Sequence, residues 1–304
     1  MTATDIDRIR SFNRFYTARL GLLARHYLGT GRSLTELRVL IEIAGDAGIS
    51  ARDLARRLDL DEGYLSRVIA GFLRDGWVAR HPVPGDKRRY NLTLTVAGQA
   101  VAEDLVARAR ADLTARLADI PPPALAAAAE ALSRAERLLT PPDPDAVTFR
   151  DIAVGDAGWL IQRHGELYAR DEGFDASFEP LVAEILTAFL RAHDPATERA
   201  FIATRGPDRL GSIFCVQSGE PGVAKLRLFF LEPEARGLGL GQRLLDACLG
   251  FARGAGYRRM VLWTHESHRA ACALYAKNGF EMTMRKPVRS FGVDLVEQSW
   301  QIAL

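Results

Sequence analysis

The stretch "EPEARGLGLGQRLL", from Glu232 to Leu245, joins an apolar run, "LRLFFL", to an amphipathic one, "RLLDACLGFAR". A glycine-rich turn between a strand and a helix usually holds a phosphate, because backbone N–H groups and the helix dipole attract an anion. The dinucleotide pattern G-x-G-x-x-G fails here, since glutamine or leucine occupies the third glycine position. The P-loop pattern fails too, because no lysine follows Gly239 or Gly241. What remains, Arg236-x-x-Gly239-x-Gly241, predicts a pyrophosphate site.

This arrangement resembles the acetyl-CoA loop, Q/R-x-x-G-x-G/A, of the GNAT superfamily of acetyltransferases. The surrounding order is strand, loop, helix, strand and helix, and it ends in "LYAKNGF", which also matches that superfamily. An early helix, "LVAEILTAFLRA", and a central strand, "RLGSIFCV", agree with the pattern. For residues 148–304 the resemblance implies an α/β GNAT acyltransferase fold, with a mixed, largely antiparallel sheet flanked by helices. It also implies acetyl-CoA (CoA) as the cofactor.

Acetyl transfer to an amine needs a neutral nucleophile, a stabilised oxyanion and a protonated leaving thiolate. The resemblance implies that backbone N–H groups of Phe230 and Leu231, at the end of the fourth strand, polarise the thioester. It also implies that Tyr275 donates a proton to the thiolate. His268 stands where the superfamily often has the Asn that contacts the pantetheine arm. The cofactor-binding residues implied are Phe230, Leu231, Arg236, Gly237, Leu238, Gly239, Leu240, Gly241, Gln242, His268 and Tyr275.

The general base is less evident, because Lys225 occupies the position at which many GNAT proteins carry Glu. A lysine acts as a base near neutral pH only if its pKa is strongly lowered. Glu232 or a water relay are the other candidates.

The acceptor groove is expected around Lys225 and Arg227, which lie two apart on a strand and so are expected to share a face with Phe229. Two cations there favour a carboxylate-bearing amine over a basic protein tail. Alternatively, both side chains only extend to solvent at a strand end. The other wall is expected from the first helix and the following loop, although the same residues are equally compatible with core. The expected substrate-binding residues are Lys225, Arg227, Phe229, Trp159, Tyr168 and Phe174, with His164 a further wall residue.

The first half of the chain has a different pattern. Residues 50–73 read "SARDLARRLDLDEGYLSRVIAGFL", with Ser50 as a plausible N-cap and a second helix that starts at Asp61. Its apolar face would pack inward and leave Tyr64, Ser66 and Arg67 outward. This is the geometry of a helix-turn-helix, whose second helix enters a DNA major groove.

A basic hairpin follows in "HPVPGDKRRYNLTLT", with Lys87, Arg88 and Arg89 at or near its tip. A basic tip of this kind suits phosphate or minor-groove contacts, although a solvated turn is the alternative. A helix-turn-helix followed at once by a basic hairpin is a winged helix. Basic residues outnumber acidic ones by nine to six from Arg52 to Arg89.

Residues 5–140 resemble the MarR family of transcription regulators in "LARRLDLDEGYLSRVIAGFLRDGWVAR", in the wing "PGDKRRYNLTLTVAG" and in the long C-terminal helix pair. The resemblance implies double-stranded DNA as a partner, and a homodimer that sets two recognition helices one DNA turn apart. Asp86 and Arg88 match the wing's Asp-x-Arg pattern, whereas Tyr64 departs from the smaller polar residue usual at its position.

Three prolines in "LTPPDPDAV" indicate a linker between the halves. We therefore expect a MarR-like, mainly α winged-helix domain at 1–140, a linker at 141–147 and a GNAT domain at 148–304. No apolar run reaches the length of a membrane span and the N-terminus lacks a signal peptide, which favours a cytoplasmic location. The three cysteines are far apart and lack metal-site spacing, so no metal is expected.

These patterns favour an acetyl-CoA-dependent N-acetyltransferase for a small amine or amino-acid-like acceptor, fused to a MarR-type DNA-binding regulator. One alternative is a regulator whose GNAT domain only senses acetyl-CoA. A second is an acetyltransferase whose winged helix only dimerises, and a third is a protein-lysine acetyltransferase.

Overall fold

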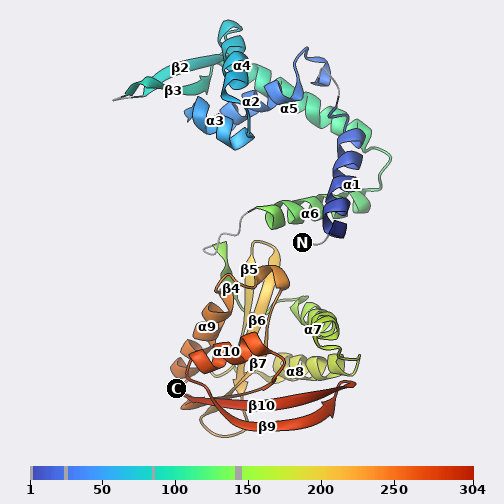
Figure 1. Cartoon of the computed structure of the whole chain (residues 1–304), viewed down its shortest axis with the longest axis vertical. Helices are drawn as coiled ribbons and strands as arrows, with labels where there is room; N and C mark the ends of the chain where they lie inside the picture. The colour runs from blue at the N-terminus through green and yellow to red at the C-terminus, as the bar shows by residue number, and fades with distance from the viewer. Residues whose placement is uncertain (1–2, 24–26, 84–85, 141–145) are drawn as a thin grey trace. The chain divides into compact units, whose positions relative to one another are not determined.

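The computed structural model describes residues 3–23, 27–140 except 84–85, and 146–304, and it leaves out the side chains of 83–89. The described chain forms two compact units, which are divided between Glu130 and Ala131. Figure 1 labels the elements of both units, and each unit is considered by itself below.

The first unit is mainly helical, with one small sheet. Its antiparallel strands have the order β1-β3-β2, which makes β2 and β3 the wing hairpin. The elements are α1 (Ala3–Arg19), a 3-10 turn (Tyr27–Gly29), α2 (Leu34–Gly45), β1 (Ile49–Ser50), α3 (Ala51–Leu58), α4 (Glu62–Arg74), β2 (Val78–Val83), β3 (Asp86–Leu94), α5 (Val96–Arg116) and the first part of α6 (Pro122–Leu139).

Local capping fixes the helix-turn-helix. The Ser50 hydroxyl accepts a hydrogen bond from the backbone N–H of Asp53, so α3 starts where the sequence predicts. Asp59 ends α3 in the left-handed conformation, and the Asp61 carboxylate then caps α4 by accepting from the N–H of Tyr64 at 2.8 Å. Behind them lies a continuous core from α2, α3, α4 and β2, with Phe72 and Leu40 fully buried.

The second unit is built on a seven-stranded sheet of order β4-β5-β6-β7-β8-β10-β9. All neighbouring strands are antiparallel except β7 and β8, which are parallel, so the sheet is mixed and largely antiparallel as expected. The elements are β4 (Thr148–Arg150), α7 (Asp156–Glu172), α8 (Phe178–Ala192), β5 (Arg199–Arg205), β6 (Asp208–Gln217), β7 (Val223–Leu231), a 3-10 turn (Pro233–Ala235), α9 (Leu240–Gly254), β8 (Arg259–His265), α10 (Arg269–Lys277), β9 (Glu281–Ser290) and β10 (Val293–Ala303).

Two apolar layers sandwich this sheet. On one face, Leu244 and Cys248 of α9 pack with Ala224 and Leu226 of β7. On the other face α7 and α8 supply the layer, and Figure 1 shows these two helices on the side of the sheet away from α9.

The central strand β7 carries an irregularity that breaks its alternation. Opposite Ile213 of β6, β7 places two residues, Leu228 and Phe229, because the register shifts between Ser212 and Phe214. Leu228 has a left-handed φ of 46°, and the Ser212 hydroxyl donates to its carbonyl at 2.6 Å. Strand β7 therefore bends at this β-bulge.

Strands β7 and β8 also cease to pair next to this β-bulge. Their parallel register runs from the Val223 and Arg259 pair to the Leu226 and Leu262 pair, although both strands continue further. The sheet therefore opens between its two middle strands just where the bulge begins.

Tight packing at Gly98 gives a test of the first unit. A Cβ at Gly98, in the first turn of α5, would lie 1.9 Å from the carbonyl oxygen of Trp77. Gly98→Ala is expected to destabilise the unit by about 1–3 kcal/mol, because backbone atoms must move. Hydrogen exchange of the amides of α5 and β2 in the full chain measures this. Gly45→Ala, where no atom lies within 4 Å of the added Cβ, is the control and should leave exchange unchanged.

Candidate active site and DNA interface

The glycine loop lies between β7 and α9. Gly237 and Gly239 have φ of 79° and 72°, a region that side chains adopt at a cost, and no atom lies within 4 Å of a Cβ built on either. Helix α9 begins at Leu240, directly after this loop. Because the first N–H groups of a helix have no intrahelical partner, the loop presents donors and a positive dipole end.

A cavity of about 750 Å³ extends from this loop, a size usual for small-molecule sites. Its walls are the loop itself, the end of β7, the last turn of α7 and the segment from Ser267 to Lys277. Arg236, Arg269 and Lys277 supply positive charge along it. Asp171 pairs with Arg236 at 3.6 Å, so the charge of Arg236 is partly offset.

A second cavity lies beside the first, between α7, α8, β7 and β8. The two cavities share Tyr168, Phe229, His268 and Ala271 in their walls. A group bound in one cavity can therefore meet a group bound in the other at these four residues.

Two cations line the second cavity. Lys225 and Arg227 are half-buried, and neither has an ion-pair or hydrogen-bond partner among the residues that the structure describes. Burial lowers the pKa of both side chains, and the charge of Arg227 lowers that of Lys225 further. An anion in this cavity would satisfy both groups.

The sequence wrongly places Phe229 on their face. The bulge at Leu228 reverses the alternation, so Leu228 and Phe230 pack with the α7–α8 layer while Phe229 packs with the α9 layer. Phe229 still contributes to the walls of both cavities.

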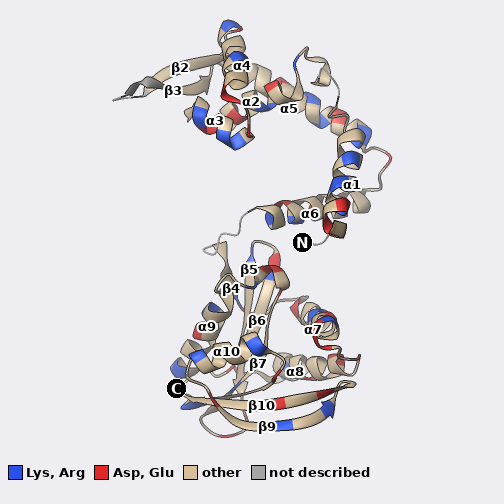
Figure 2. Cartoon of the chain, viewed as in Figure 1, with Lys and Arg blue, Asp and Glu red and all other residues tan. Residues whose placement is uncertain are grey.

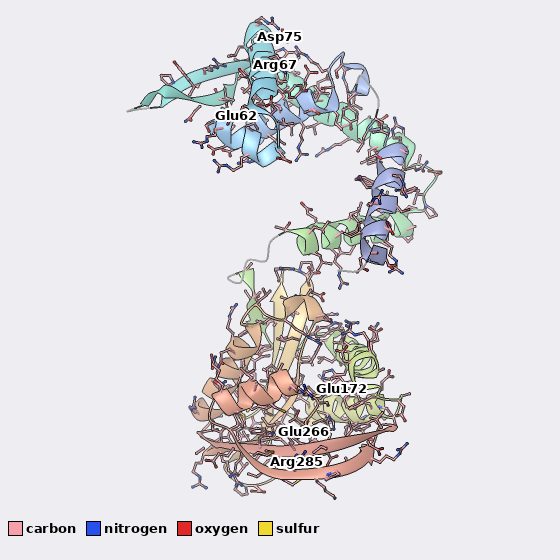
Figure 3. All side chains as sticks on the ribbon, in the orientation of Figure 1. Glu62, Arg67, Asp75, Glu172, Glu266 and Arg285 are labelled. Carbon is pink, nitrogen blue, oxygen red and sulfur yellow. The ribbon has the colours of Figure 1, made fainter. Side chains whose placement is uncertain are left out.

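Three histidines also line the second cavity: His164, His265 and His268. Burial lowers the pKa of each to about 4, so all three are neutral at pH 7. The Nδ1 of His268 lies 3.2 Å from the Thr264 hydroxyl, and its Nε2 lies 3.6 Å from Glu172, which is labelled at the end of α7 in Figure 3.

Tyr275, the expected general acid, is buried in α10 and lines the second cavity. Its ring packs near Phe229 and Phe280, at centroid distances of 6.2 and 5.5 Å. Burial raises the pKa of its hydroxyl, so Tyr275 keeps its proton throughout the physiological range and can donate it.

Glu232 is placed unfavourably for the base role that the sequence suggests. It is buried and accepts hydrogen bonds from Arg163 of α7 on both oxygens, at 2.7 and 2.6 Å. It lines neither cavity among the described residues. This bidentate pair ties α7 to the end of β7, and we therefore set Glu232 aside as a base.

The first unit presents the expected recognition helix. Ser66 and Arg67 are exposed on α4, and Figure 3 labels Arg67 there. Tyr64 is half-buried against the core rather than fully outward, because its ring packs back on the helical cluster. Figure 2 shows basic residues gathered on the neighbouring α3. The side chains of Lys87, Arg88 and Arg89 lie outside the described residues.

Comparisons with known proteins find a family for each half of the chain. Residues 162–280 match the family model for the acetyltransferase (GNAT) family, and residues 30–89 match that for the MarR family. Over 266 residues the chain is 30% identical to the mycothiol acetyltransferase of Thermomonospora curvata, covering 80% of this chain and 81% of that protein. The chain belongs to the GNAT acetyltransferase family.

Its first unit is a MarR-family domain fused to that GNAT domain. It is 40% identical over 73 residues to the HTH-type transcriptional regulator BilQ of Clostridium symbiosum, covering 24% of this chain and 51% of that protein. The chain spans only 32% and 46% of two further mycothiol acetyltransferases that it matches. A solved acetyltransferase from Salmonella typhimurium, determined with acetyl-CoA, is 19% identical, with a TM-score of 0.41 over 52% of this chain and 94% of that one.

Acetyl-CoA is the co-substrate of the GNAT family, and the first cavity fits it. The N–H groups at the start of α9 suit a pyrophosphate. The cavity wall continues past Phe230 and Leu231 to the junction with the second cavity, where the thioester would lie. Among the described residues, all the expected cofactor residues except Leu238 and Tyr275 line the first cavity. Tyr275 lines the second cavity instead.

Two expected wall residues of the acceptor groove of this GNAT domain instead support the core. Phe174 is buried among Tyr168, Phe178 and Phe291. Trp159 packs on Phe230 at 5.3 Å, and neither residue lines the described second cavity. The first helix is amphipathic, so its apolar side was equally compatible with core.

Sequence reasoning missed His265 and gave His164 no chemical role. His265 ends β8 and is almost fully buried, with both ring nitrogens lacking a hydrogen-bond partner among the described atoms. The "THESH" run at the end of β8 could have drawn notice, because two histidines three apart near a strand end can line one site.

Gly239 tests the cofactor loop of the GNAT domain. Gly239→Glu is expected to weaken acetyl-CoA binding at least tenfold, because it places a side chain at positive φ and a negative charge beside the pyrophosphate. Isothermal calorimetry with acetyl-CoA measures the loss. Gly250→Glu, an exposed change further along α9 with open space around it, should bind normally. Equal affinity in both folded variants would remove this loop from the site.

Proposed function

We propose that this protein transfers the acetyl group of acetyl-CoA to a small amine that carries a carboxylate, and that its MarR-family domain binds double-stranded DNA as a homodimer. The observation that carries the acceptor assignment is a pair of cations, Lys225 and Arg227, that have no partner among the described residues and lie in a cavity that meets the cofactor cavity. Half-buried charges are costly unless an opposite charge accompanies them, so a carboxylate of the acceptor suits this site.

The surrounding walls support a small acceptor over a protein tail. His164, Tyr168, Phe178 and Trp263 give the cavity an aromatic lining, which favours a compact, partly apolar molecule. A lysine-rich tail would bring more positive charge to Lys225 and Arg227, which is electrostatically unfavourable.

Each step of the transfer then has a group in this chain. Acetyl-CoA supplies the acetyl group as a thioester. The backbone N–H groups of Phe230 and Leu231 stabilise the negative charge that develops on the carbonyl oxygen. Tyr275 donates its hydroxyl proton to the leaving sulfur.

Arg227 tests the acceptor assignment. Arg227→Ala is expected to lower kcat/KM at least tenfold for L-phenylalanine and L-methionine, because loss of one partner of a buried charge pair costs about 2 to 5 kcal/mol. The matching decarboxylated amines, 2-phenylethylamine and 3-(methylthio)propylamine, should lose little. Acetyl-CoA-dependent thiol release measures both sets.

Arg191→Ala, an exposed change on α8, is the control and should leave all four rates unchanged. Equal losses for the acids and the amines would indicate damage to the fold rather than a carboxylate site. Faster acetylation by the wild-type protein of polyamines or lysine peptides than of any amino acid would contradict the assignment.

A homodimer of the MarR-family domain is supported by apolar surface that its own chain leaves uncovered. Helix α1 buries none of its residues, and Ile9, Phe12 and Phe15 are exposed by 53%, 48% and 61%. Large exposed apolar side chains on one terminal helix suit an interface between copies.

DNA binding is tested at the recognition helix and the wing. Arg67→Ala is expected to change which base sequences are preferred, because an exposed residue near the N-terminal end of α4 reaches base edges. Lys87→Ala and Arg88→Ala should weaken binding to all sequences and reduce the salt dependence by about one phosphate contact each. Fluorescence anisotropy with the DNA upstream of the protein's own gene, at several salt concentrations, measures both effects.

Arg74→Ala, at the opposite end of α4, is the control and should retain affinity and preference. Wild-type protein that binds this DNA without salt dependence, or not at all, would leave the winged helix as a dimerisation module. Acetyl-CoA binding without transfer to any amine would instead favour a sensor role.

A further inference from the structure

His164 has its tautomer fixed by the helix that carries it. Its ring Nδ1 lies 2.8 Å from the backbone carbonyl oxygen of Leu160, one turn earlier on α7. A carbonyl can only accept, so Nδ1 carries the proton and donates it. In a neutral imidazole the other nitrogen, Nε2, is then a bare hydrogen-bond acceptor.

This acceptor has no partner among the described atoms. His164 is 2% exposed, its Nε2 is buried without a hydrogen bond, and the residue lines the second cavity. A buried polar atom without a partner costs free energy, which a donor group of a bound molecule would recover. An amine N–H is such a donor.

The ring of His164 also lies beside the groups that handle the acetyl group. It is 4.6 Å from the ring of Phe230, whose backbone N–H is a proposed oxyanion donor. It stacks at 5.8 Å on Tyr168, which belongs to the walls of both cavities. His164 itself lines the second cavity and not the first, which puts the residue on the acceptor side of the junction.

The other two histidines of the cavity are less suited to accept a proton from the amine. The Nδ1 of His268 is within hydrogen-bond distance of the Thr264 hydroxyl, and its Nε2 lies 3.6 Å from the carboxylate of Glu172, whose negative charge disfavours the approach of an acceptor carboxylate. His265 packs at 4.6 and 5.5 Å against Trp263 and Phe174, and among the described residues its ring stacks on no residue of β7.

We propose that His164 is the general base of the reaction and that its Nε2 takes the proton from the acceptor amine. This inference rests on the proposed acetyltransferase function. As the amine nitrogen bonds to the thioester carbon, its N–H proton moves to Nε2. The C–S bond then breaks, and the sulfur receives the proton of Tyr275. Solvent afterwards returns a proton to the tyrosine and takes one from the imidazolium, so protons balance.

The charges around the cavity fit this role. Lys225 and Arg227 from β7 disfavour a protonated amine, so the acceptor is bound as the neutral nucleophile. Burial keeps His164 unprotonated beforehand, because it lowers the pKa of the imidazole. The carboxylate of the acceptor offsets the two cations during transfer. The remaining titratable groups that face the cavity, Tyr168, His265, His268 and Tyr275, are neutral at pH 7.

A first test needs no acceptor. In wild-type protein with ¹⁵N-labelled histidine, the spectrum at pH 7 should show His164 with a proton on Nδ1 and none on Nε2. The signal is assigned by its absence from His164→Gln. A proton on Nε2, or on both nitrogens, would overturn the proposal even if no acceptor were known.

A second test uses kinetics with L-phenylalanine and acetyl-CoA. His164→Gln, which keeps the volume but cannot take a proton, should bind acetyl-CoA with wild-type affinity and lose at least about 100-fold in kcat, the usual contribution of a general base. His193→Gln is the matched control, because His193 makes the same ring-to-carbonyl contact, with Phe189 at 2.9 Å, but does not line either cavity. His265→Gln, which changes another residue of the same cavity wall, should lose less kcat than His164→Gln.

Chemical rescue separates chemistry from packing. In His164→Ala, imidazole should restore kcat at least tenfold, whereas pyrrole, of similar size but without a basic nitrogen, should restore none. Equal rescue by both, a kcat of His164→Gln close to wild type, or the larger loss in His265→Gln would each overturn the proposal. A wild-type protein that acetylates no amine would refute the proposed function instead, while the labelled spectrum still decides the state of His164.

Discussion

The β-bulge at Leu228 in β7 is the constraint on which both cavities of the GNAT domain depend. The extra residue bends β7 just after Leu226, the last residue of β7 that pairs with β8. If β7 and β8 remained paired along their full length, their backbone hydrogen bonds would close the space between them. The bulge instead turns the ring of Phe229 toward the α9 layer and leaves Leu228 and Phe230 on the face of α7 and α8. The Ser212 hydroxyl, bonded to the Leu228 carbonyl, stabilises the strained backbone.

Helix α7 forms one wall of the site because an ion pair holds it. Arg163 binds both oxygens of buried Glu232, which directly follows β7. A buried carboxylate without this partner would be strongly destabilising, so the pair fixes the position of α7 relative to the bulged strand. The adjacent His164 and, one turn later, Tyr168 are then held over the junction of the cavities. Glu232, which the sequence suggested as a general base, thus positions the α7 residues that line the site.

The MarR-family domain has a complete apolar core, whereas the apolar side chains of its terminal helix α1 remain exposed. The helix-turn-helix and wing enclose a full apolar cluster. Helix α1 buries nothing, although it carries a phenylalanine pair. No helix among the described residues is long and apolar enough to cross a membrane. A second copy of the chain is the partner we propose for the exposed apolar side chains of α1.

The sequence by itself determined the two family memberships, the element order and the glycine loop before α9. Those depend on local patterns: a Ser50 cap, glycines at positive φ and runs of apolar residues with helical or strand period. The loop from Arg236 to Gly241 was predictable because its backbone conformation requires glycine. The mixed, largely antiparallel sheet followed from the family resemblance.

The composition of the second cavity was decided only by the tertiary structure. A single inserted residue in β7 changes which side chains share a face of the sheet. The alternation of side chains along an ideal strand therefore predicted the wrong face for Phe229. Burial decided the remainder, since the same amphipathic helix could present Trp159 to a groove or to the core. The same applies to the choice of base. Arg163, from a helix distant in the sequence, pairs with the carboxylate of Glu232, whereas one imidazole nitrogen of His164 has no hydrogen-bond partner among the described residues. Such partners come from segments far apart in the chain, and only folding brings them together.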